Sequence, residues 1–403
     1  MAVMYDVAIV GGGIVGLATG LALTERFPRL RLVLLEKESR IGTHQTGHNS
    51  GVIHSGIYYR PGSYKARLTV EGARQLIEFC EQDGIRYERI GKVIVATTDA
   101  ELPRLQTLYE RGTANGVPGL RLLEPGELRT IEPHAAAVRA IHSPSTAIVD
   151  FTEVAAALDL RLRAAGAEIL TGRHITRVVR DGDGVRLCSS RGETAARRVI
   201  NCAGLYSDVV ARLMGAPTAV RIIPFRGEYY MVRPERHDLV RGLVYPVPDP
   251  AFPFLGVHFT RTIHGQVEAG PNAVLAFARE GYSLGRVRPG ELAGALGYRG
   301  FWAMVARYWR TGSYEMYRSL SKAAFVRALQ RLIPAIRPED VTPGGAGVRA
   351  QAVAADGSLV DDFSIVSGPD AIHVLNAPSP AATASLAIGR HIAALAREAF
   401  GLA

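Results

Sequence analysis

Three glycines near the start of the chain have the spacing of a phosphate-binding turn. They lie in the sequence GGGIVG, after a short apolar stretch typical of a strand (residues 5–10) and before a helical pattern. The first glycine allows a tight turn, the second lets a pyrophosphate approach the backbone, and the third lets the helix pack on the strand. The start of the helix would present free N–H groups to the phosphates. The predicted contacts are Gly11, Gly13, Ile14, Val15 and Gly16.

A carboxylate follows at the position expected for a ribose contact. The second apolar strand, residues 31–36, ends in Glu36, which stands 20 residues after Gly16. A carboxylate there accepts a hydrogen bond from a ribose 2′-hydroxyl and repels a 2′-phosphate. The spacing, the flanking elements and the acid together favour a dinucleotide over an unrelated glycine-rich turn. We include the adjacent Lys37 in the predicted site.

Three later features favour FAD over NAD. The chain has no second G-x-G-x-x-G after a strand, and residues 344–347 have neither that spacing nor a following helix. An apolar strand runs into two small residues, which permit close approach to a ligand. Near the C-terminus, a helix expected to begin near Ala381 would bring its N-terminus to a reduced flavin. An ordinary strand–turn–helix is the alternative for either segment. The predicted contacts are Ala203, Gly204, Pro378, Ser379, Pro380, Ala381, Ala382 and Thr383.

Composition excludes several classes of protein. The chain has 403 residues, 47% hydrophobic and 21% charged, so it can bury a large core and is not disordered. Its three cysteines have no metal-binding spacing, and we expect no metal and a reducing compartment. The net charge of +9 comes mainly from arginines spread along the chain, so nucleic acid is not an expected partner. Without a signal-peptide pattern or a long apolar run, the expected location is the cytoplasm.

The remaining patterns indicate an α/β protein whose nucleotide-binding fold is interrupted. Helices are expected at 63–83, at 99–115, from Thr152 and over 290–333, and strands at 86–97, at 167–200 and within 221–281. We predict a discontinuous Rossmann-like FAD-binding domain and a mixed β-sheet and helix substrate domain, with a pocket between them. The first domain is assigned residues 1–85, 150–220 and 340–403, and the second residues 86–149 and 221–339.

The sequence resembles the L-2-hydroxyglutarate oxidase/dehydrogenase family, within the D-amino-acid-oxidase-like group of FAD enzymes. Matching segments run from Val10 to Gly389, and the most specific are HQTGHNSGVIH, PDPAFPFLGVHFTR and NAPSPAATAS. The resemblance implies FAD, oxidation of L-2-hydroxyglutarate to 2-oxoglutarate by hydride transfer to flavin N5, and passage of the electrons to a quinone or O₂. It also implies that the polar loop at residues 41–60 approaches the flavin. The contacts expected in that loop are Thr46, His48, Asn49, Ser50, Gly51 and Val52.

A histidine is the expected base in such a site. A 2-hydroxy acid loses its hydroxyl proton to a base while its Cα hydride leaves, and an imidazole can accept that proton near neutral pH. We favour His258, on an alternating strand, as the base, and we place His54 at the flavin or the substrate. A hydrogen-bonded structural histidine is the alternative for each.

The implied substrate carries two carboxylates, which arginine binds with fixed bidentate geometry. Arginines in the family-specific segments are therefore candidates, together with tyrosine hydroxyls and one of the chain's rare lysines. The predicted substrate-binding residues are Arg226, Arg261, Arg349, Tyr58, Tyr59, Tyr245 and Lys322.

Two alternatives stay open. An amine or amino-acid oxidase of the same group is the second activity considered, and a flavin-binding docking protein with little turnover is the third. The region 290–333 mixes arginine with tryptophan and tyrosine. We interpret it first as a helical cover on the second domain and, because of the family, also as a peripheral contact with the inner face of the cell membrane.

Overall fold

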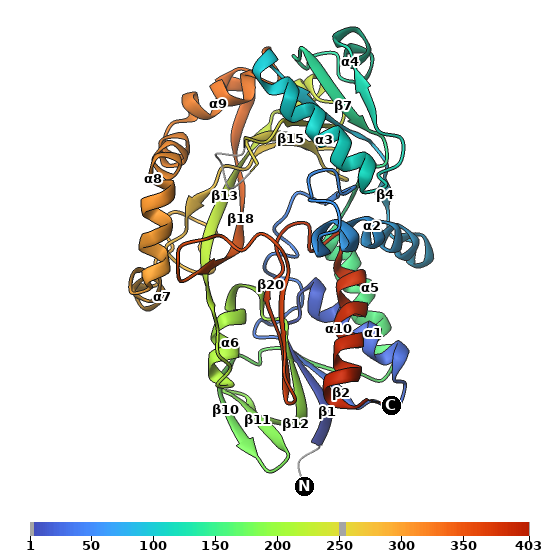
Figure 1. Ribbon diagram of the computed structural model, residues 1–403, viewed down its shortest axis with the longest axis vertical. Coiled ribbons are helices and arrows are strands. Elements are labelled where there is room, and N and C mark those ends of the chain that lie inside the picture. Colours follow the sequence, from blue (N-terminus) through green and yellow to red (C-terminus); the bar gives the residue numbers. More distant parts are fainter. Residues whose placement is uncertain (1–3, 250–254, 403) are drawn as a thin grey trace.

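Two large β-sheets form the frame of the molecule, one in the lower and one in the upper half of Figure 1. The computed structural model describes residues 4–249 and 255–402. Part of the family-specific segment PDPAFPFLGVHFTR, residues 250–254, lies outside that range. This α/β architecture with two sheets confirms the predicted fold class.

The lower sheet is built around the N-terminal strand. Strand β1 lies between β2 and β12 and runs parallel to both, and β20 is parallel to β12. The carboxyl ends of these strands therefore meet at one edge, where a doubly wound sheet binds its ligand. The strands of this sheet are β1 (Met4–Val10), β2 (Leu32–Leu35), β9 (Glu168–Leu170), β10 (Ile175–Asp181), β11 (Gly184–Ser189), β12 (Gly192–Asn201), β19 (Ser364–Ser367) and β20 (Ala371–Asn376).

Helices pack on the lower sheet and bury most of its apolar side chains. One hydrophobic cluster joins β1 and β2 to several of them, with Val7, Ile9, Leu17, Leu158 and Ile392 all fully or almost fully buried. Continuous apolar strands such as VAIV and LVLL fit a sheet that is covered on both faces. The helices at this sheet are α1 (Ile14–Arg26), α2 (Tyr64–Asp83), α5 (Phe151–Ala164), α6 (Ser207–Leu213) and α10 (Ser385–Phe400).

Capping residues explain where these helices begin. The Ser63 hydroxyl accepts the Ala66 N–H, so α2 begins at Tyr64, as predicted. The helix expected from Thr152 begins one residue earlier, because the carboxylate of Asp150 accepts the Thr152 N–H and caps it. The C-terminal helix begins at Ser385 and not near Ala381, since residues 379–384 form successive turns.

The upper sheet is mainly antiparallel. Strands β13 and β18 pair along almost their whole length and link it to the lower half of the molecule. Its strands are β5 (Lys92–Ala96), β6 (Arg121–Leu123), β7 (Arg139–Ser143), β13 (Val220–Val232), β14 (Leu243–Pro246), β15 (His258–Arg261), β16 (Val267–Gly270), β17 (Val274–Leu275) and β18 (Val341–Ala354). A small third sheet contains β3 (Val52–Ile53), β4 (Tyr87–Glu88) and β8 (Ala147–Val149).

The other helices are α3 (Leu102–Ala114), α4 (Pro125–Ile131), α7 (Pro289–Leu296), α8 (Arg299–Leu320) and α9 (Lys322–Gln330). The region expected to be helical over 290–333 thus consists of three successive helices. The predicted domain boundaries stay a prediction. Strand β18, from the segment 340–403, joins the upper sheet, and residues 344–347 lie inside this strand and not in a nucleotide-binding turn.

Candidate active site

A cavity of about 1190 Å³ connects the two large sheets. Its lining includes the glycine-rich turn after β1 at one end and Tyr245, His258 and Arg349 of the upper sheet at the other. Small-molecule pockets commonly measure about 300–1,000 Å³. The cavity is therefore large enough for a dinucleotide together with a small substrate.

The glycine-rich turn lies directly against the end of β12. Gly11 has a φ of +116°, and a Cβ there would lie 2.4 Å from the carbonyl oxygen of Cys202. A Cβ at Gly16 would lie 2.0 Å from the carbonyl oxygen of Gly11. Only glycine fits at both positions, because the turn is compressed between β12 and the start of α1. Because these glycines carry no side chains, the backbone of the turn remains accessible from the cavity.

Glu36 closes the ribose side of the turn. Its buried carboxylate accepts the backbone N–H of Gly12 at 2.7 Å and that of Glu38 at 2.8 Å. Each carboxylate oxygen keeps a further lone pair, since an ionised carboxylate has about four acceptor sites. The cradle of glycine backbone and fixed carboxylate fits the ribose and pyrophosphate of an adenine dinucleotide.

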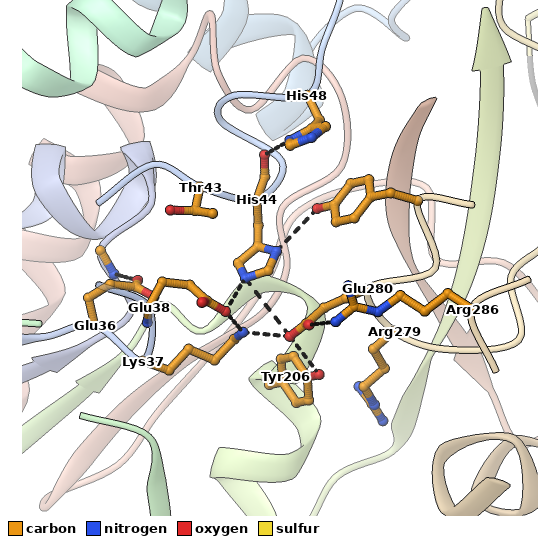
Figure 2. A network of polar contacts seen from close by, with 12 residues as sticks. Glu36, Lys37, Glu38, Thr43, His44, His48, Tyr206, Arg279, Glu280 and Arg286 are labelled. Atoms are coloured by element: carbon orange, nitrogen blue, oxygen red, sulfur yellow. Dashed lines mark hydrogen bonds and ion pairs between the residues drawn. The ribbon is translucent and has the colours of Figure 1, made fainter. Parts of the chain in front are cut away.

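Lys37 joins a polar network that links this cradle to a loop of the upper half (Figure 2). Its ammonium contacts the carboxylates of Glu38 and Glu280. The Nε2 of His44 lies 3.0 Å from Glu38 Oε1, and the Tyr206 hydroxyl donates to Glu280 Oε1 at 2.9 Å. We call these five residues the clasp. Through Glu280, the clasp links the segment 276–286 to Lys37, which directly follows Glu36 in the chain.

Charge within the clasp favours ionised carboxylates and no metal. A hydrogen bond from Lys37 holds the pKa of Glu38 below its ordinary value. Burial alone would raise the pKa of Glu280, but Lys37 and Tyr206 hold it below its ordinary value. Glu38, His44 and Glu280 bring possible ligand atoms within 4.8 Å of one another. The Lys37 ammonium pairs with both carboxylates and Arg286 pairs with Glu280, so these two positive charges balance the carboxylates and oppose a metal cation.

At the upper end of the cavity, hydrogen bonding fixes the tautomer of His258. Its Nδ1 lies 2.9 Å from the carbonyl oxygen of Gly256, so Nδ1 carries the proton and Nε2 keeps a lone pair. Burial, together with the charges of Arg349 and Lys92, lowers the pKa of His258 to about 3, although the bond to Gly256 opposes this shift. The imidazole is therefore neutral, as a proton acceptor must be.

Two buried polar atoms near His258 have no hydrogen-bond partner among the described residues. They are the Tyr58 hydroxyl and the Nδ1 of His54, and both side chains line the cavity. Burial lowers the pKa of His54 well below its ordinary value, and burial raises that of Tyr58. A buried polar atom left unpaired costs free energy, which a ligand with acceptor or donor atoms would recover.

The structure brings most of the predicted site residues together. All predicted cofactor contacts except Gly16 and Gly51 line the cavity, as do His54, His258, Tyr58, Tyr59, Tyr245 and Arg349. Gly16 and Gly51 shape the backbone beside it, since a Cβ at Gly51 would lie 2.7 Å from the carbonyl oxygen of Val149.

Three predicted substrate contacts lie elsewhere. Arg226, on β13, is buried, pairs with Glu228 at 2.9 Å and is not among the residues that line the cavity. Lys322 lies at the first residue of α9, and Arg261, at the end of β15, is also outside the lining.

One buried lysine was not among the predicted residues. Lys92 is only 1% exposed and lies beside the rings of Tyr58 and Tyr245. The available signal was a lysine, rare in this chain, at the start of the apolar run KVIVA. The prediction chose another of the rare lysines, Lys322, although the sequence around it is helical and amphipathic.

Comparison with known proteins places the chain among flavoenzymes. A family model described as FAD dependent oxidoreductase matches residues 6–395. The chain is 51% identical to the L-2-hydroxyglutarate dehydrogenase of Indibacter alkaliphilus, over 98% of this chain and 100% of the relative. It is 45% identical to the human mitochondrial L-2-hydroxyglutarate dehydrogenase, over 99% of this chain and 90% of the relative. The chain belongs to the L-2-hydroxyglutarate dehydrogenase family.

Members of this family are FAD-dependent oxidoreductases, and the fold agrees. The structure of L-α-glycerophosphate oxidase from Mycoplasma pneumoniae, with FAD bound, aligns with a TM-score of 0.79 at 22% identity, covering 98% of this chain and 94% of that chain. At this identity the likeness concerns the fold. In the present family member, the glycine-rich turn and Glu36 would hold the adenosine diphosphate part of FAD. The flavin would lie toward the turns before α10, which line the same cavity.

Proposed function

We propose that the protein oxidises L-2-hydroxyglutarate to 2-oxoglutarate with FAD as its cofactor. The observation that carries the proposal is the juxtaposition, at the upper end of the cavity, of a neutral His258 with Arg349, Tyr58 and His54. This set offers a proton acceptor beside groups that bind anions. The relatives at 45–51% identity, named L-2-hydroxyglutarate dehydrogenases, support the same substrate.

His258 is the proposed base. Its Nε2 accepts the substrate hydroxyl proton while the C–H bond at Cα breaks and the C–O single bond becomes the carbonyl of 2-oxoglutarate. Bound FAD supplies the hydride acceptor at flavin N5. The dicarboxylate substrate brings negative charge beside His258, which raises the pKa of its imidazole and makes it a stronger base in the complex.

Arg349 and Tyr58 are the proposed anchors of the substrate. Arg349 lines the cavity on β18, and a guanidinium binds a carboxylate through two parallel hydrogen bonds. The buried Tyr58 hydroxyl stays protonated and can donate to an anion, since burial raises its pKa. These positive and donor groups disfavour the ammonium of an amino-acid substrate, which makes an amine oxidase the weaker candidate.

Product analysis tests this proposal. The purified holoenzyme is incubated with an artificial electron acceptor and L-2-hydroxyglutarate, and the products are identified by mass spectrometry. We expect 2-oxoglutarate from the L-enantiomer and none from the D-enantiomer. Formation of 2-oxoglutarate and ammonia from L-glutamate, with no turnover of L-2-hydroxyglutarate, would contradict the proposal and favour the amine-oxidase alternative.

The proposed physiological acceptor is a quinone at a membrane surface, with O₂ as the alternative. Trp302 and Trp309, seven residues apart on α8, are each 57% exposed, and Leu320 at its end is 72% exposed. The two tryptophans flank the kink of α8 at Tyr308, and both are exposed. Exposed tryptophan beside arginine suits the surface of an anionic membrane. None of the helices in the described part of the chain has the length and apolar character needed to cross a bilayer.

The same helix borders the cavity. At Tyr308 the backbone of α8 departs from helical geometry, and the side chain of this residue lines the cavity. An acceptor held by the exposed tryptophans would therefore lie on the element that already forms part of the cavity wall.

A further inference from the structure

Lys92 occupies an unusual position for a lysine. It begins β5, only 1% of it is exposed, and its Nζ lies 4.7 Å from the ring centroid of Tyr58 and 5.2 Å from that of Tyr245. Among the described residues, no carboxylate lies within salt-bridge distance of this ammonium. Lysine is almost never fully buried unless it is paired with an anion. The chain therefore buries a cation whose partner is not supplied by its own described carboxylates.

The aromatic rings around Lys92 are uncharged. Tyr58 and Tyr245 stay protonated because burial raises their pKa values, to about 12 for Tyr245. Burial is the main cause that lowers the pKa of both His54 and His258, so both imidazoles are neutral. The charges of Lys92 and His258 lower the pKa of His54 further.

Two further charged groups face this cluster from other strands. Arg349, on β18, adds positive charge beside His258. Glu268, on β16, acts on Tyr245, and burial raises its pKa.

Lys92 does not line the cavity itself but lies behind the two tyrosines that do. A cation over the face of an aromatic ring draws on the ring's electrons and strengthens the hydroxyl as a donor. The Tyr58 hydroxyl has no partner among the described residues, so it is free to donate into the cavity. The two rings thus lie between the cation and the cavity, and the Tyr245 ring is tilted against that of His258, with 3.9 Å between the ring centroids.

We propose that Lys92 is a positioning residue that selects a dianionic substrate through Tyr58 and Tyr245. This inference rests on the proposed function and names the residue that deepens its specificity. Arg349 binds one carboxylate of the substrate, and the Lys92 charge, transmitted through the tyrosine rings, stabilises the other. A substrate with one carboxylate leaves this buried cation uncompensated.

The proposal predicts that binding of a dianion is coupled to uptake of a proton. Burial lowers the pKa of Lys92 to about 7, so above neutral pH much of the free enzyme carries a neutral amine. A bound dianion stabilises the ammonium and raises this pKa. Binding at pH 8 therefore takes up about one proton, whereas binding well below pH 7 takes up none, because Lys92 is already charged.

Calorimetry of the oxidised holoenzyme measures this coupling without turnover. The probe is 2-oxoglutarate, which has no hydride to transfer, titrated at pH 8 in buffers with different ionisation enthalpies. Two variants are matched to each other. Lys92→Met removes the charge at similar length, and Lys92→Arg keeps a charge that does not titrate. The monocarboxylate 2-oxobutyrate serves as the control ligand.

We expect proton uptake by the unaltered enzyme and none by either variant. Lys92→Met should bind 2-oxoglutarate about tenfold or more weakly and 2-oxobutyrate almost unchanged, while Lys92→Arg should keep much of the affinity. Proton uptake that persists in Lys92→Arg would overturn the inference even if Lys92→Met failed to fold. If the unaltered enzyme does not oxidise L-2-hydroxyglutarate, the proposed function itself fails. Oxidation with unchanged proton coupling in the variants contradicts the role of Lys92 alone.

Discussion

The ring of Tyr245 lies against the imidazole of His258, with 3.9 Å between the centroids and 31° between the planes. The carbonyl of Gly256 binds the Nδ1 proton of the same imidazole. The ring plane and the tautomer are therefore set before substrate arrives. A base held in this way loses little freedom when the reaction begins.

Replacing His258 by alanine should remove the base. We expect the rate of flavin reduction by L-2-hydroxyglutarate to fall at least ~10²-fold while FAD stays bound, because a positioned base commonly contributes that much. Rapid-mixing absorbance measures the rate. His264→Ala is the matched control, since His264 is exposed and pairs with Asp150. Near-normal reduction by His258→Ala would reject His258 as the base.

Tyr58→Phe removes a buried hydroxyl without changing the shape of the ring. A hydrogen bond to a charged group contributes about 1.5–3 kcal/mol, so we expect KM for L-2-hydroxyglutarate to rise about tenfold or more. Thermal stability should not fall, because this hydroxyl has no partner among the described residues. Tyr314→Phe, at an exposed position on α8, is the control. An unchanged KM would show that the hydroxyl does not contact the substrate.

Gly11→Ala should abolish FAD binding. The added Cβ would lie 2.4 Å from the Cys202 carbonyl oxygen at a φ of +116°, which forces the turn away from β12. The ratio of bound flavin to protein after purification measures the effect. Gly62→Ala separates strain from crowding, since Gly62 also has a positive φ but a Cβ there would have no other atom within 4 Å. Full flavin content in Gly11→Ala would contradict the assignment of the turn.

The clasp should slow the release of FAD. Glu280→Gln weakens its contacts with Lys37 and Arg286, so we expect faster dissociation of FAD on dilution, with Glu339→Gln as an exposed control.

The pKa values of Glu38 and Glu280 lie below their ordinary value of 4.5. Their stabilising effect is therefore complete above pH 4.5 and is lost as the pH falls through the lowered values. FAD release that is equally fast in both variants and the unaltered enzyme would contradict this role.

The role of the exposed tryptophans of α8 can be tested on vesicles. The double variant Trp302→Ser and Trp309→Ser should lose most of its binding to vesicles that contain anionic lipid, because interfacial tryptophans supply much of the binding energy. Its rate with a soluble acceptor should stay unchanged, since neither tryptophan is a cavity residue. Co-sedimentation measures the binding. Undiminished binding by the double variant would contradict the proposed membrane contact.

Local patterns in the sequence were sufficient to predict the dinucleotide-binding turn. The glycine spacing, Glu36 and the flanking elements all lie within 36 residues, and the structure assembles them as neighbouring strand ends. The start of α2 was predictable for the same reason, because Ser63 caps the helix through contacts three residues away.

The substrate end was harder to predict because its residues come from distant strands. His258, Tyr245 and Arg349 meet only through the pairing of β13 to β18 and the order of the upper sheet. A single arginine on a strand gives no local signal for the face it occupies, which is why Arg226 and Arg349 could not be distinguished. For Lys92, the only indication of burial in the sequence was the apolar run that follows it, since burial of a charge depends on tertiary packing.

Anaerobic stopped-flow absorbance of the purified holoenzyme tests the central claim most directly. Oxidised enzyme is mixed with L-2-hydroxyglutarate, D-2-hydroxyglutarate or L-glutamate, and the flavin absorbance is followed. The account predicts rapid bleaching by the L-hydroxy acid and none by the other two compounds. A bound flavin that L-2-hydroxyglutarate leaves oxidised would contradict it.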